Sequence, residues 1–128
     1  MSGREEIRVD GLAEPISHYT DAVRAGDLLF LSGCVPIDAD GTLVPGDVIA
    51  QARQAFANVE AVLAAAGAGF GDVVKVTIFL TDVDDRAAVN TVRQEVFGSA
   101  RPASTLVEVS RLAIPGARIE VEAVALLP

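Results

Sequence analysis

The pattern that most constrains the fold is a helix-periodic segment followed closely by a strand-periodic one. Through residues 48–66 apolar side chains recur at steps of three and four, which predicts an amphipathic helix with Asp47 as its N-cap. Residues 73–80 then alternate, with Lys75 and Thr77 on the side opposite the apolar one, as in a half-buried strand. Because the helix is rich in alanine, it can lie close to a neighbouring sheet. The two segments therefore predict a helix layered on a sheet.

Six strands and two helices can be predicted along the whole chain. The second helix begins at Asp82 or Asp84 and runs to about residue 97. The other strands are residues 5–9, 22–25, 28–32, 105–109 and 118–126. The simplest packing is a single α+β domain over residues 1–128, a mixed six-stranded sheet with two helices on one face. Two helices leave the other face partly apolar, so we expect a closed homo-oligomer.

Composition and charge exclude several classes of protein. With 51% apolar residues in 128, the chain can build a core without disulfides or metals. Its net charge of −8, from 18 acidic and 10 basic residues, argues against a nucleic-acid partner. The longest uncharged apolar run, residues 61–71, is far short of the ~20 residues of a membrane span, so we expect no membrane partner. A charged N-terminal segment and a single cysteine, Cys34, favour a cytoplasmic protein.

Few residues could carry chemistry. The chain has one histidine, His18, and no spacing typical of metal ligands or of nucleotide-binding loops, so no cofactor is expected. The most unusual feature is Glu120 and Glu122, two carboxylates on one face of the apolar last strand. If buried, such a glutamate has a raised pKa and is a candidate proton carrier. On an edge strand both would instead be solvated charges that discourage aggregation.

Several segments in order resemble the RidA family, also called YjgF or L-PSP, over almost the whole chain. They are ISHY at 16–19, GDLLFLSG at 26–33, QARQAFANV at 51–59, GDVVKVTIFL at 71–80, VN at 89–90, RPAS at 101–104, VEVSRL at 107–112 and IEVEAVA at 119–125. The resemblance implies a chorismate-mutase-like α+β fold. In that fold six-stranded sheets form the barrel-like core of a homotrimer, with a small-molecule cleft at each subunit interface.

The resemblance also implies an activity. Active members hydrolyse imines and enamines of small 2-amino acids to ammonia and a 2-keto acid, with no metal or organic cofactor. An arginine holds the substrate carboxylate, and a glutamate on the last strand positions or activates water. By similarity, Glu120 is the catalytic residue of this chain. The substrate-binding positions implied by similarity are Tyr19, Ser32, Gly33 and Asn90.

The chain departs from the family pattern at the carboxylate-binding arginine. Deaminating members carry that arginine after Pro-Ala, where this chain has Ser104, and the common cysteine two residues later is Leu106. We therefore expect altered specificity at Ser104, Thr105 and Leu106. Strand alternation puts Arg111 on the face opposite Ser104, which argues against it as a replacement. Arg101, or an arginine of a neighbouring subunit, stays open as a substitute.

Two functions follow as hypotheses. The first is an imine or enamine deaminase whose substrate is neutral or cationic, because Glu120 is kept and the usual arginine is not. The alternative is a non-catalytic trimer whose interface clefts hold a small metabolite. RNA cleavage, a third class, is disfavoured by the net charge of −8.

Overall fold

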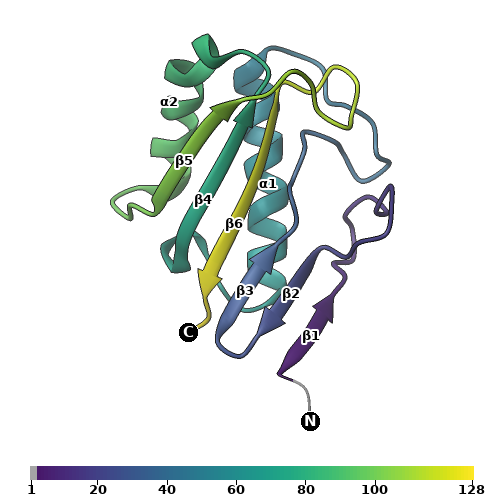
Figure 1. The fold of residues 1–128 in the computed structure, drawn as a ribbon, viewed down its shortest axis with the longest axis vertical. Helices are drawn as coiled ribbons and strands as arrows, with labels where there is room; N and C mark the ends of the chain where they lie inside the picture. Colours follow the sequence, from purple (N-terminus) through teal and green to yellow (C-terminus); the bar gives the residue numbers. More distant parts are fainter. Residues whose placement is uncertain (1–2) are drawn as a thin grey trace.

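The computed structural model describes residues 3–128, and within them six strands form one sheet (Figure 1). The strand order is β1-β2-β3-β6-β4-β5, and all pairs in it are antiparallel except β4 with β5. The strands are β1 (Arg4–Ile7), β2 (Ala22–Ala25), β3 (Leu28–Leu31), β4 (Val73–Leu80), β5 (Ala103–Glu108) and β6 (Ile119–Leu126). The helices are α1 (Val48–Ala65) and α2 (Arg86–Phe97), and the 3-10 turns η1 (Phe70–Asp72) and η2 (Val83–Asp85) precede β4 and α2.

The mixed six-stranded sheet with two helices, predicted from the sequence, is confirmed. Two strand boundaries differ from the expected ones by two residues, and the other differences are of one residue. β1 ends at Ile7 instead of residue 9, because the next two residues bond the Asp21 carboxylate and leave the sheet. β5 begins at Ala103 instead of residue 105, directly after Pro102, where it pairs with Lys75 of β4.

Local sequence signals set the ends of the elements. Asp47 caps α1 as predicted, because its carboxylate accepts the N–H of Ala50 at 3.0 Å. Gly67 follows α1 with φ 76°, a conformation that glycine adopts at little cost, and it ends the helix. Because α1 ends at Ala65, the chain can turn back and begin β4 at Val73.

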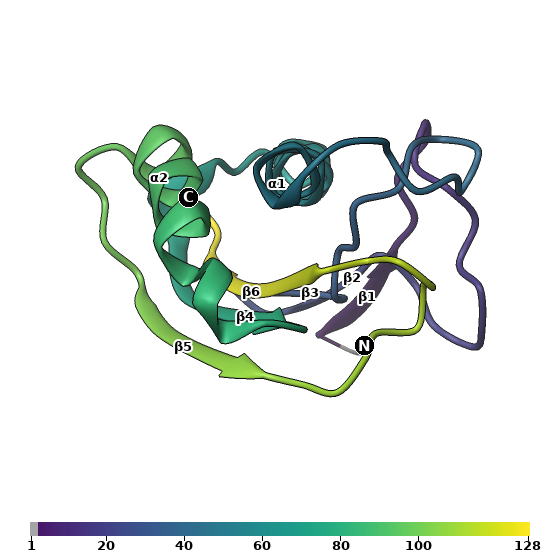
Figure 2. The ribbon, with the colours of Figure 1, turned by 90° about the horizontal axis from the view of Figure 1, so that it is seen from above.

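Both helices lie on the same side of the sheet, which we call the helix face (Figure 2). Residues at alternate strand positions point into the core between the sheet and α1, among them Leu29, Ile78 and Val121, all with no exposed surface. From α1, Phe56 packs into this core, and its ring packs edge to face against the ring of Phe97 in α2, with 6.1 Å between the ring centroids. The core therefore joins the middle strands to both helices.

The opposite side of the sheet, the open face, keeps large apolar side chains in contact with solvent. Register places Leu28 beside Leu126 and Phe30 beside Val124 on this face. Phe30 is 45% exposed and Leu126 is 51% exposed. Apolar side chains on one sheet face without a covering layer are typical of a surface that is buried by association. The open face also carries Glu120, opposite Phe79 of β4.

Candidate functional site

The site centres on a close approach between the Glu120 side chain and the backbone at Gly33. The segment after β3 is held against β6 by two hydrogen bonds, from Cys34 N to Val121 O at 2.7 Å and from Val121 N to Cys34 O at 2.9 Å. A β-carbon placed on Gly33 would lie 2.6 Å from Glu120 Oε1, closer than real side-chain contacts allow. Glycine at position 33 therefore lets the carboxylate lie directly against the main chain.

The carboxylate of Glu120 lines a pocket on the open face. The cavity has a volume of about 290 Å³. Its lining comes from the segment between β1 and β2, the end of β3, the loop before β6, and β6 itself. These residues are Ile16, Ser17, Tyr19, Ser32, Gly33, Val35, Ala113, Ile114 and Glu120. Four of the predicted site residues, Tyr19, Ser32, Gly33 and Glu120, thus meet in one pocket.

The electrostatics of this pocket favour a protonatable carboxylate. Glu120 is half-buried, and burial raises its pKa, with a further contribution from the negative charge of Glu122. No residue in the described range 3–128 donates a hydrogen bond to it, while Glu122 is exposed. The sequence left two alternatives for these glutamates, a buried proton carrier or a solvated surface charge. The environment of Glu120 is consistent with the first, and that of Glu122 is consistent with the second.

The environment of the Cys34 thiol, next to the pocket, favours its protonated form. Burial, together with the negative charges of Asp21 and Glu120, raises the pKa of Cys34 to about 12. The sulfur is therefore protonated, and its Sγ lies 3.7 Å from the carbonyl oxygen of Ser32.

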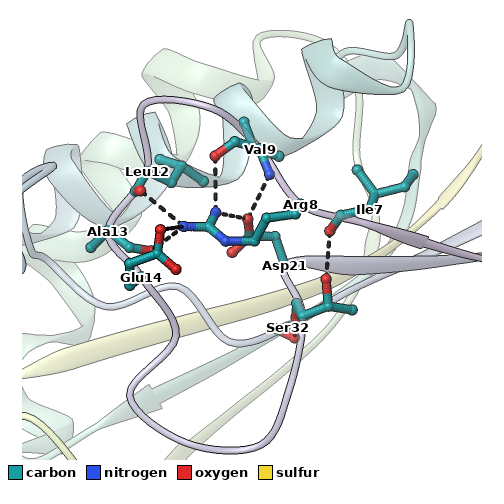
Figure 3. Close-up of polar contacts among 9 residues, drawn as sticks. Ile7, Arg8, Val9, Leu12, Ala13, Glu14, Asp21 and Ser32 are labelled. Atoms are coloured by element: carbon teal, nitrogen blue, oxygen red, sulfur yellow. Dashed lines mark hydrogen bonds and ion pairs between the residues drawn. The ribbon is translucent and has the colours of Figure 1, made fainter.

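A hydrogen-bond network fixes the segment that carries Tyr19 (Figure 3). The guanidinium of Arg8 pairs with the carboxylate of Asp21, and the N–H of Val9 donates to the same carboxylate at 2.7 Å. Arg8 also donates to three carbonyl oxygens, those of Val9 at 2.9 Å, Leu12 at 3.2 Å and Ala13 at 3.0 Å. Nothing in the sequence pattern singles out this pair, because its members are 13 residues apart in an irregular segment.

Ser32 has a structural contact in addition to its place in the pocket. Its hydroxyl donates to the carbonyl oxygen of Thr20 at 2.5 Å, and the hydroxyl of Thr20 donates to the carbonyl oxygen of Ile7 at 2.8 Å. This chain of hydrogen bonds ties the end of β3 to β1. Tyr19, between these anchors, is 46% exposed and free to contact a ligand.

The other predicted residues lie elsewhere in the protomer. Asn90, on α2, lines a groove between α2 and the start of β5. Pairing with β4 places Ser104 and Leu106 on the helix face, and Leu106 packs against the core. Thr105 is on the open face, where its hydroxyl lies 2.7 Å from Lys75 Nζ. Glu120 and Ser104 therefore occupy opposite faces of the same sheet.

One residue near Ser104 was not found by sequence reasoning. Arg93 of α2 donates from Nη2 to the hydroxyl oxygen of Ser104 at 2.8 Å. The available signal was its spacing from Asn90, since residues three apart share a helix face. Arg101 is exposed beside the same groove, and Arg111 is exposed without an ion pair among the described residues.

Neither a metal cluster nor a membrane helix is present among residues 3–128. No three His, Cys, Asp or Glu side chains in this range stand together where they could hold a metal ion. Neither helix in the described range combines the length and the apolar character needed to cross a bilayer.

Comparisons with known proteins match nearly the whole chain. A family model described as endoribonuclease L-PSP matches residues 11–127. A RutC family protein of Pyrococcus horikoshii is 44% identical over 123 residues, which are 95% of this chain and 97% of that protein. The 2-iminobutanoate/2-iminopropanoate deaminase of Escherichia coli strain K12 is 38% identical over 122 residues, 93% of this chain and 94% of that protein.

Solved structures agree with these sequence matches. YEO7 of yeast superposes with a TM-score of 0.94 at 32% identity, covering 98% of this chain and 99% of that chain. The structure of E. coli TdcF with bound serine superposes with a TM-score of 0.89 at 34% identity, covering 97% of this chain and 99% of that one. The resemblance seen in the sequence is confirmed, and the chain belongs to the L-PSP family, also called the RidA or YjgF family.

Proposed function

We propose that this protein is a cofactor-free hydrolase that deaminates an imine or enamine by adding water, with Glu120 as the catalytic residue. The observation that carries the proposal is the half-buried Glu120 carboxylate, which lies against Gly33 and receives no hydrogen bond from the described residues. Relatives named 2-iminobutanoate/2-iminopropanoate deaminase, in goat and in E. coli, support this reaction class.

The reaction needs a base that first takes and then returns a proton. Glu120 accepts a proton from water while the water oxygen bonds to the C=N carbon, the C=N π bond becomes a lone pair on nitrogen, and the nitrogen takes up a proton from solvent to become an amine. The resulting carbinolamine collapses: its hydroxyl proton is lost to solvent, the C–O bond becomes C=O, and the C–N bond breaks. Glu120 returns its proton to the leaving nitrogen, so the imine and water become a carbonyl compound and ammonia.

The pocket offers groups to orient the substrate. The backbone N–H of Gly33 makes no hydrogen bond within the described residues, and Gly33 lines the same cavity as Glu120. Tyr19 and Ser32 also line this cavity. These residues bind substrate, and Glu120 performs the proton transfers.

We further propose a homotrimer in which the substrate cleft lies between protomers. Glu120 and Ser104 lie on opposite sheet faces of one chain, so the two can share a cleft only if they come from neighbouring protomers. The apolar open face supplies the surface for this association. In that arrangement Asn90, Ser104 and Leu106 of one protomer contact a substrate next to the partner's pocket. Thr105, whose side chain is on the open face, takes part only through its backbone. The substrate specificity of this protein then differs from that of relatives that have an arginine at the position of Ser104.

RNA cleavage, which the name of the family model suggests, is not part of the proposal. The net charge of −8 opposes binding to a phosphate backbone. A cytoplasmic location, expected from the sequence, is kept as part of the proposal.

The test compares two isosteric substitutions on the same strand face. Glu120→Gln removes the proton acceptor, whereas Glu122→Gln removes a neighbouring exposed carboxylate. Ammonia release from 2-iminopropanoate should fall about 100-fold or more in Glu120→Gln, since general acid–base groups contribute roughly 10²–10⁴-fold. It should stay near the wild-type rate in Glu122→Gln at pH 8.

Equal activity of Glu120→Gln and wild type would refute the assigned role. A wild-type protein that hydrolyses no imine, but is thermally stabilised by a small metabolite, would replace the proposal with the metabolite-binding trimer.

A further inference from the structure

The groove between α2 and β5 is a positively charged concavity outside the Glu120 pocket. It has a volume of about 430 Å³. Its lining includes two arginines and two side-chain amides but no carboxylate. The residues are Asn90, Arg93, Gln94, Phe97, Gly98, Ala100, Arg101 and Pro102. The chain as a whole has a net charge of −8, so a groove lined by cations and no acidic residue is locally positive where the rest of the protein is mostly negative. Such a groove favours binding of an anion.

Arg93 differs from the other arginines of residues 3–128. Arg8, Arg53 and Arg118 each pair with a carboxylate. Arg93 is half-buried, yet no carboxylate within the described chain lies within 4.0 Å of it. Burial without such a partner lowers the pKa of Arg93, although a guanidinium stays protonated at neutral pH. A half-buried cation without a counter-charge is stabilised when an anionic ligand binds beside it.

Ser104 holds this guanidinium in place. Its hydroxyl oxygen accepts one N–H of Arg93 at 2.8 Å. A guanidinium has five N–H donors in a planar fork, so four remain for a ligand. Such a fork matches the two oxygens of a carboxylate. Serine is also small enough to leave the space in front of the fork open.

We propose that Arg93, oriented by Ser104, binds the carboxylate of the substrate in place of the arginine that relatives carry at the position of Ser104. The inference rests on the proposed function, and it revises the sequence-based expectation of a neutral or cationic substrate. The cationic contact comes from α2, and Ser104 acts as a positioning residue on β5. Because Ser104 and Glu120 lie on opposite sheet faces, Arg93 serves the pocket of a neighbouring protomer.

The experiment compares Arg93→Gln with Arg111→Gln, an exposed arginine without an ion pair, as the matched control. Two imines of similar size are generated in situ by oxidases: 2-iminopropanoate, and uncharged butan-2-imine. Enzyme-dependent ammonia release is measured for each. In Arg93→Gln, kcat/KM for 2-iminopropanoate should fall about 10- to 100-fold, the loss of hydrogen bonds to a charged group. It should not change for butan-2-imine, and Arg111→Gln should match wild type for both.

Unchanged hydrolysis of 2-iminopropanoate by Arg93→Gln would overturn the inference, and so would an equal loss for both imines. If Arg93→Gln does not fold, as judged by its thermal unfolding, Ser104→Ala takes its place. That variant keeps the guanidinium but removes the hydroxyl that orients it. It should lose about 3- to 10-fold on 2-iminopropanoate alone, less than Arg93→Gln, because the cation itself is still present. No loss in Ser104→Ala would then overturn the inference.

Pyruvate binding separates failure of the inference from failure of the proposed function. If the wild-type protein hydrolyses neither imine, the proposed function is wrong, and pyruvate titrated by calorimetry tests the anion site alone. Pyruvate that binds wild type and Arg111→Gln but at least 10-fold more weakly to Arg93→Gln supports the site. Equal binding to all three proteins, or binding to none, overturns it.

Discussion

Replacing Gly33 with alanine places a methyl carbon 2.6 Å from Glu120 Oε1, 2.8 Å from Cδ and 3.1 Å from Cγ. An ordinary contact begins at 3.4 Å, so the carboxylate must move by about 0.8 Å, the gap between 2.6 and 3.4 Å. Gly33 is not among the glycines with positive φ, so the backbone at this position accepts alanine. The strain therefore falls on the Glu120 side chain alone.

The effect on stability and the effect on activity should differ in size. Turning a half-buried side chain off its preferred rotamer costs about 0.5–1.5 kcal/mol, which corresponds to a few degrees in Tm. A catalytic group displaced by roughly 1 Å can lose on the order of 100-fold in rate. We expect Gly33→Ala to keep a Tm within about 5 °C of wild type and to lose about 10- to 100-fold in kcat/KM for 2-iminopropanoate.

The assay measures kcat/KM by ammonia release and Tm by circular dichroism on the same preparations. Gly71→Ala is the matched control, because a β-carbon there meets nothing within 4 Å and φ is not positive. Wild-type kcat/KM in Gly33→Ala would refute the reasoning, since Glu120 would then not depend on its place against Gly33. A loss of activity that follows a large drop in Tm would also refute it.

Three further predictions concern charge and packing. Glu122→Gln removes a negative charge that raises the pKa of Glu120, so Glu120 should stay ionised to lower pH. The acid limb of the pH profile of kcat/KM should therefore shift to lower pH, and a shift to higher pH would contradict this. Asp21→Ala leaves the buried N–H of Val9 without its acceptor and removes the carboxylate that pairs with Arg8, and it should lower the free energy of unfolding in urea by about 1–3 kcal/mol. No loss of stability would mean that the network is not stabilising. Phe30→Asp puts a charge on the open face and should turn the proposed trimer into monomers, measured by light scattering, while Glu60→Asp, at an exposed position on α1, should leave the assembly unchanged. A trimeric Phe30→Asp variant would show that this face is not the interface.

Much of the fold follows from periodic patterns. The steps of three and four in α1 and the alternation in β4 are local properties, because they reflect which side chains share a face within one element. Asp47 is likewise recognisable from its neighbours alone. The family motifs add Tyr19, Ser32, Gly33 and Glu120, which the structure brings into one pocket.

The rest depends on how distant segments pair. Strand order and register put Ser104 and Glu120 on opposite faces, and neither is contained in the pattern of a single strand. The Glu120 carboxylate lies so close to Gly33 that a β-carbon there would be 2.6 Å from Oε1. This contact exists because β6, almost ninety positions later in the chain, runs beside the segment that follows β3.

The sequence by itself determined the helices, the strands, the family and the candidate base. The tertiary structure alone decided that Arg93 of α2 reaches Ser104, and that Arg8 holds the segment before Tyr19 through Asp21. The physical reason is that a repeating pattern specifies which face of an element is apolar, whereas a polar contact between elements depends on their packing geometry. That geometry is set by the whole core, which no local pattern encodes.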